Sequence, residues 1–148
     1  MTDHNPTLQV LIAPLVQEAI VPHKAHLSDA GFDLAIPADY TLAPQAQTSI
    51  NLGFAIQIPA GWYGQVFGRS SVFQQGLAVH PGVIDADFRG AVQLLIYNRL
   101  PTELMIYRGD RLAQLLLLPV ASTVLSTVTP DELSHTERGS GGMGSTGR

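Results

Sequence analysis

Proline and glycine interrupt the first half of this chain so regularly that no long helix fits between them. From residue 14 to residue 61 they stand at Pro14, Pro22, Gly31, Pro37, Pro44, Gly53, Pro59 and Gly61. Such spacing is typical of short strands joined by turns. The 148 residues hold 14 glycines and 10 prolines in all. We therefore predict an all-β fold with many short connections and no helix longer than two turns.

Five segments have the composition of strands, and they comprise residues 8–12, 49–58, 63–67, 91–97 and 112–118. Residues 49–58 (SINLGFAIQI) alternate, with Gly53 interpreted as a bulge or a close approach of two backbones. Residues 112–118 (LAQLLLL) could be helix or strand by pattern, and their short length favours a buried strand. Residues 129–132 (TPDE) combine a capping residue, proline and two acids, which predicts one short helical turn.

Composition excludes several classes of protein. The formal charge is −4, so broad or stable nucleic-acid binding is not expected. The absence of cysteine excludes disulfides, a thiol nucleophile and a thiolate zinc site. No apolar run is long enough to span a membrane, and the acidic start does not resemble a signal peptide. We expect a soluble, cytoplasmic protein.

The last eleven residues, RGSGGMGSTGR, differ from the rest because five of them are glycine. A segment of this kind cannot bury a core and is expected to be flexible when nothing is bound. We predict a core over residues 1–128 and a tail over residues 129–148.

Five short motifs combine glycine with charged or hydroxyl residues, and they are AGFDL (30–34), GRSS (68–71), GVIDADFRG (82–90), RGDRLAQ (108–114) and RGSGGMGSTG (138–147). Each alone is most often a plain turn, because Gly, Asp and Ser favour turns for backbone reasons. No P-loop motif is present. In their order and spacing, the five motifs resemble those of the trimeric dUTP pyrophosphatase (dUTPase) family.

The resemblance implies a distorted jelly roll, or β-clip barrel, that assembles as a homotrimer. It implies hydrolysis of dUTP to dUMP and pyrophosphate with Mg²⁺, which limits uracil in DNA and supplies dUMP for dTMP synthesis. Asp85 is then the general base that holds the attacking water. A hairpin with legs at 79–84 and 91–93 would read uracil through its main chain.

The remaining roles follow from the same resemblance. Substrate-binding positions are Arg69, Ser70, Ser71, Val79, Gly82, Val83, Ile84, Phe88, Gln93, Arg138, Met143, Gly144, Ser145 and Thr146. Asp33 and Gln114 would contact Mg²⁺ only through water, since this ion keeps several waters and relies on substrate phosphates. The tail would close over a neighbouring subunit's site.

Three residues depart from the family pattern. Phe88 replaces a tyrosine that stacks on the sugar, Ser71 replaces a glycine, and Met143 replaces a phenylalanine that stacks on uracil. The loss of ring stacking at Met143 would weaken binding by about 0.5–1.5 kcal/mol. Two alternatives share the fold: a dCTP deaminase, which needs a glutamate that residues 79–85 lack, and a catalytically silent nucleotide-binding protein.

Overall fold

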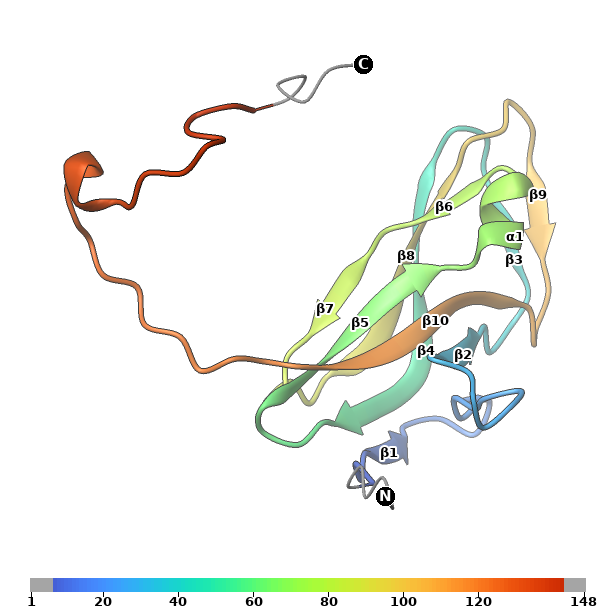
Figure 1. Ribbon diagram of the computed structural model, residues 1–148. Coiled ribbons are helices and arrows are strands. Elements are labelled where there is room, and N and C mark those ends of the chain that lie inside the picture. Colours follow the sequence, from blue (N-terminus) through green and yellow to red (C-terminus); the bar gives the residue numbers. More distant parts are fainter. Residues whose placement is uncertain (1–6, 143–148) are drawn as a thin grey trace.

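Two four-stranded antiparallel sheets enclose the hydrophobic core (Figure 1). The computed structural model describes residues 7–142. The first sheet has the order β1 (Leu11–Pro14), β4 (Gln47–Gln57), β8 (Ala91–Asn98) and β6 (Leu77–Val79). The second has the order β2 (Phe32–Ala35), β10 (Arg111–Pro119), β5 (Trp62–Gly68) and β7 (Gly82–Ile84). A third sheet pairs β3 (Tyr40–Leu42) with β9 (Leu104–Ile106), and the all-β prediction is confirmed.

Alternation along the central strands explains how the core forms. In β4 the buried apolar side chains are Ile50, Leu52, Phe54 and Ile56, and in β8 they are Val92, Leu94 and Ile96. Because successive side chains of a strand point to opposite faces, each strand gives one apolar row to the core. Burying each such side chain fully contributes about 1.5–3 kcal/mol.

Four of the five expected strands are present close to their expected bounds, as β4, β5, β8 and β10. The first is displaced, since residues 8–12 were expected and β1 runs from Leu11 to Pro14. The ladder starts at Leu11 because its partner there, Gln57, is the last residue of β4. Pro14 is tolerated because β1 is an edge strand.

Gly53 forms the predicted irregularity in β4. Its φ is +76°, and the pairing with β8 shifts register between Asn51 and Ala55. The Gly53 amide donates to Asn51 Oδ1 at 2.8 Å. A Cβ atom at this position would lie 2.5 Å from Val16 Cγ2, so both the backbone angle and the space require glycine.

Two short helical turns complete the described chain. The turn predicted at residues 129–132 is the 3-10 helix η1 (Pro130–Glu132), which starts with a capping box between Thr129 and Glu132. Glu132 Oε2 accepts from the Thr129 amide and hydroxyl, and these contacts hold the pKa of Glu132 below its ordinary value. The helix α1 (Ser70–Gln74) follows β5 directly and is too short to leave a periodic signal in the sequence.

The chain beyond β10 extends away from the sheets (Figure 1). Val120 donates its amide to the Gly61 carbonyl, and the hydrogen bonds seen from residue 121 to 142 are all local to this segment. The last strand ends at Pro119, ahead of the boundary expected at residue 128, which stays a prediction. Between residues 7 and 142, no helix has the length and apolar character needed to cross a membrane.

Candidate active site

Strands β7 and β8 diverge into different sheets and leave a cavity between them. Gly82 and Ile84 of β7 pair with Val66 and Gly64 of β5. The start of β8 pairs with β4 alone, and only its far end, from Ile96 to Asn98, pairs with β6. The hairpin expected between residues 79–84 and 91–93 is thus paired only at the end away from its turn. There Val79 pairs with Ile96 and the His80 amide donates to the Leu95 carbonyl at 2.8 Å, whereas residues 82–84 pair with β5 instead of β8.

The cavity has a volume of about 260 Å³ and is lined by Val66, Gly82, Val83, Ile84, Asp85, Phe88, Ala91, Val92 and Gln93. Six predicted site residues are in this set. Val79 is not, since it pairs with Ile96 and packs close to Gly68. The Gln93 side chain accepts a hydrogen bond from Ser49 Oγ at 2.7 Å, on the neighbouring strand β4.

A turn after β7 presents Asp85 and Phe88 at the mouth of this cavity. The Phe88 amide donates to the Asp85 carbonyl at 3.1 Å. Arg89 Nη1 fixes the same turn by donating to the carbonyls of Ala86 and Phe88, at 2.7 and 2.9 Å. The Asp85 side chain is exposed, and no hydrogen bond to it is seen from residues 7–142. An exposed carboxylate beside a cavity is free to hold a water molecule.

A second group of predicted residues meets where β2, β5 and β10 lie side by side. Asp33 of β2 is the register partner of Gln114 in β10, and Gly68 at the end of β5 is the partner of Ala113. The Arg69 amide donates to the Leu112 carbonyl at 3.1 Å. Three motifs that are far apart in sequence are thus joined by one sheet.

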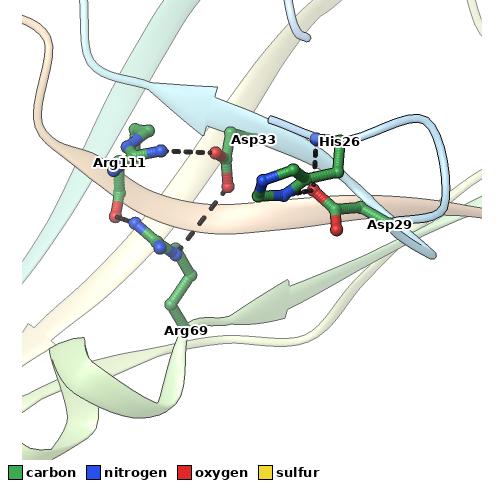
Figure 2. Close-up of polar contacts among 5 residues, drawn as sticks. All are labelled: His26, Asp29, Asp33, Arg69 and Arg111. Carbon is green, nitrogen blue, oxygen red and sulfur yellow. Dashed lines mark hydrogen bonds and ion pairs between the residues drawn. The ribbon is translucent and has the colours of Figure 1, made fainter. Parts of the chain in front are cut away.

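Asp33 holds two arginines at this point (Figure 2). Its Oδ2 accepts from Arg111 Nη1 at 2.9 Å, and its Oδ1 lies 3.8 Å from Arg69 Nε. Arg69 Nη1 also donates to the Arg111 carbonyl at 3.2 Å. Sequence reasoning missed Arg111 as a site residue. The available signal was its place in RGDRLAQ, directly at the start of a strand.

Gly31 lies in a tight space beside the Gln114 side chain. A Cβ atom on Gly31 would lie 3.0 Å from Gln114 Oε1 and 3.2 Å from Gln114 Cβ. The turn before this glycine is closed by Asp29, whose Oδ2 accepts from the His26 amide at 2.8 Å (Figure 2). The AGFDL motif thus packs β2 closely against β10.

Ser70 and Ser71 follow Arg69 as the first two residues of α1, and both are exposed. Ser71 lines a polar cavity of about 410 Å³ together with Arg69 and Arg111. This cavity shares no lining residue with the cavity beside Asp85. Within one chain, the candidate base and the candidate phosphate ligands therefore occupy two separate sites.

Among the described tail residues, the predicted Arg138 lines neither cavity. Arg138 donates from Nε to the Gly141 carbonyl at 3.1 Å, within the extended segment of Figure 1. The predicted positions Met143, Gly144, Ser145 and Thr146 lie outside the described residues.

The chemistry of the donor set bears on a metal ion. Among residues 7–142, no three or more His, Cys, Asp or Glu side chains gather as in a protein-held metal site. Gln114 is the register partner of Asp33, and its amide oxygen suits a hydrogen bond from metal-bound water. Asp33 suits this role poorly, because two guanidinium groups already share its carboxylate.

Comparison with known proteins identifies the family. The sequence model of one family, described as dUTPase, matches residues 17–147. The chain belongs to the dUTPase family. It is 40% identical over 141 residues to the deoxyuridine 5'-triphosphate nucleotidohydrolase of Corynebacterium jeikeium, covering 92% of this chain and 91% of the relative. Identity to the enzyme of the same name from Paramecium bursaria Chlorella virus 1 is 34%, covering 93% and 97%.

Solved dUTPase structures share the fold. The dUTPase of Staphylococcus bacteriophage 80alpha with dUpNHpp is 28% identical with a TM-score of 0.88, covering 96% of this chain and all of that chain. A variant dUTPase of the S. aureus phage phi11, described with a structural Mg(II) ion, is 26% identical with a TM-score of 0.79, covering 84% and 99%. The predicted jelly-roll class is confirmed by these relatives.

Proposed function

We propose that this chain is a cytoplasmic, Mg²⁺-assisted dUTP diphosphatase that works as a homotrimer and converts dUTP and water to dUMP and pyrophosphate. The observation that carries the proposal is the cavity between β7 and β8, with Asp85 and Phe88 at its mouth. Membership of the dUTPase family supports the same reading. The reaction would limit uracil in DNA and supply dUMP for dTMP synthesis.

Base recognition follows from the divergence of the two strands. β7 uses one edge for its ladder with β5, and residues 91–93 of β8 use one edge for β4. The opposite edges face the cavity and offer main-chain N–H and C=O groups in alternation. A uracil ring presents both an N–H donor and carbonyl acceptors, so it can pair with such edges. The close fit of Val83 and Ile84 would exclude the 5-methyl group of thymine.

Sugar recognition is assigned to Phe88. Its ring is 43% exposed and lies at the cavity mouth, where a deoxyribose can stack on it. A ribose would add a hydroxyl group at a crowded edge. Selection of deoxyribose over ribose by shape should be retained with Phe88 in place of the family's tyrosine, because the ring stays and only the phenol oxygen is lost.

The chemistry assigns Asp85 as the general base. Its carboxylate orients a water molecule and takes one proton as the water oxygen attacks the α-phosphorus. The bond from the α-phosphorus to the bridging oxygen breaks, and pyrophosphate leaves with the bonding electron pair. Arg69, Ser70 and Ser71 would bind phosphate oxygens. Mg²⁺, when bound to the phosphates, would neutralise part of their charge, with Gln114 in contact with its water shell.

The trimer explains why one chain separates its functional residues. Asp85 and Arg69 line cavities without a common residue, and Arg138 lies on a segment that leaves the core. A symmetric assembly can complete each site with the Asp85 cavity of one copy, the arginine pair of a second copy and the tail of a third. In that assembly Arg138, Met143, Gly144, Ser145 and Thr146 would close over the substrate.

The test is pyrophosphate release from dUTP, dCTP, dTTP and UTP, with ammonia release measured in parallel. We expect pyrophosphate from dUTP far above the other three and a mass of three chains by light scattering. Ammonia release from dCTP would identify a deaminase instead. Tight binding of dUTP without turnover would identify a silent nucleotide-binding protein.

A further inference from the structure

Three charged side chains from three strands or strand ends form one cluster, and only Arg69 among them has a proposed role. Arg111 begins β10, Asp33 lies in β2, and Arg69 follows β5 (Figure 2). Arg111 touches Arg69 in two ways: through the shared Asp33 carboxylate, and through its own carbonyl, which accepts from Arg69 Nη1 at 3.2 Å. We propose that Arg111 is a positioning residue for the phosphate-binding Arg69, and that Asp33 acts as the link between the two arginines.

Charge explains why a second arginine is needed. Two guanidinium groups and one carboxylate leave a net charge of +1, which favours a phosphate group over a divalent cation. Without Arg111, Asp33 and Arg69 would form a neutral pair. The Asp33 carboxylate would then compete with the substrate's phosphate for the same guanidinium group. Arg111 prevents this by taking Asp33 Oδ2 at 2.9 Å, the shortest contact in the cluster.

Geometry and exposure support the assignment. Asp33 is the most buried member, with 16% of its side chain exposed, while 33% of Arg69 and 43% of Arg111 are exposed. Each guanidinium carries five donors, and the hydrogen bonds within the cluster use one donor of each arginine. Arg69 is thus held in place and still has donors for a ligand.

The inference rests on the proposed function, since it takes the triphosphate of dUTP as the ligand of Arg69. The probe is the nonhydrolysable analogue dUpNHpp, bound by the full-length trimer. Calorimetry is run first in EDTA and then across a Mg²⁺ titration. Because the readout is binding, a failure of the inference is distinct from a failure of wild-type hydrolysis.

Arg111→Gln is expected to weaken Mg²⁺-free binding of dUpNHpp at least tenfold, and Arg111→Lys to restore part of it by restoring the charge. Arg69→Gln should weaken binding similarly. Adding Arg111→Gln to Arg69→Gln should then cost less than twofold, because Arg111 acts through Arg69. If the double variant instead lost affinity for dUpNHpp by the product of the two single-variant losses, the proposal would be overturned. Arg108→Gln is the matched control, since Arg108 lies in the same motif as Arg111 but its side chain donates to the carbonyls of Glu18 and Pro37 instead of entering this cluster.

The variant Asp33→Asn distinguishes the positioning of Arg69 from a simple effect of the Asp33 charge on phosphate binding. Removal of a negative charge beside a phosphate site should strengthen binding if charge alone matters. Loss of the link should weaken it, and we expect a loss of at least fivefold with the Mg²⁺ midpoint unchanged within twofold. Stronger binding, or a shifted Mg²⁺ midpoint with unchanged binding in EDTA, would contradict the proposal. If Asp33→Asn does not fold, the Arg111 and Arg69 series decides the question alone.

Discussion

The ring of Phe88 lies so close to Gly90 that a Cβ atom on residue 90 would stand 2.7 Å from Phe88 Cζ. The glycine at the end of GVIDADFRG therefore sets where the ring can lie. This contact connects a backbone position to the side chain that we assign to sugar recognition.

Gly90→Ala is expected to displace the Phe88 ring and reduce selection against UTP. The ratio of kcat/KM for dUTP over UTP should fall by about tenfold, within the range of a single lost packing contact. Phe88→Tyr is the control, because it keeps the ring and should keep the ratio. An unchanged ratio in a folded Gly90→Ala variant would remove Phe88 from sugar recognition.

Asp85→Asn tests the general base. Since Asp85 is exposed at a turn, the fold should not change, and dUpNHpp should bind within a few-fold of the wild-type affinity. We expect kcat to fall by about 10²–10⁴-fold, the usual contribution of general-base catalysis. Asp87→Asn, two residues along the same exposed turn, should leave kcat within twofold. Equal losses in both variants would indicate a disturbed turn rather than a lost base.

Gly53 and Gly61 form a matched pair for backbone strain. Both have a positive φ, +76° at Gly53 and +83° at Gly61. A Cβ atom at residue 53 would clash with Val16, whereas a Cβ atom at residue 61 would have no atom within 4 Å apart from its own residue and its chain neighbours. Gly61→Ala should lower the free energy of unfolding by about 1–2 kcal/mol. Gly53→Ala should cost about 1–3 kcal/mol more, from overpacking. Urea denaturation measures both, and Val16→Ala should relieve part of the extra cost.

Truncation after Glu137 tests the tail. It removes Arg138 and the glycine-rich motif, and we expect kcat/KM for dUTP to collapse while UTP stays a poor substrate. A chain lacking only Arg148 is the control. A rise of UTP relative to dUTP after truncation would mean that selectivity belongs to the tail rather than to Phe88.

The sequence allowed the strands and their irregularities to be predicted, because both follow from local rules. Alternation gave β4 and β8, and an isolated glycine in an alternating segment gave the bulge at Gly53. The partner of each strand could not be obtained this way. The residues of β7 carry no mark that they pair with β5, since any strand edge offers the same hydrogen-bonding groups.

The site was predicted in its parts but not in its arrangement. Asp85, Phe88 and Arg69 follow from the motifs, and the structure places them around two cavities. Arg111 was missed because RGDRLAQ holds three charged residues, Arg108, Asp110 and Arg111, of which only the last reaches Asp33. Arg108 instead donates to the carbonyls of Glu18 and Pro37. The register between β2 and β10 determines which charged side chain of RGDRLAQ lies close enough to Asp33 to pair with it.

The parting of β7 from β8 also has an evolutionary consequence. A base held between these strands is read by groups that every residue type carries, so codon changes at the lining positions alter the fit of the cavity without rewriting the hydrogen-bonding pattern. A new base preference would require a new path for the chain, through an insertion, a deletion or a register shift. Drift in the surrounding side chains is therefore compatible with a constant choice of nucleotide.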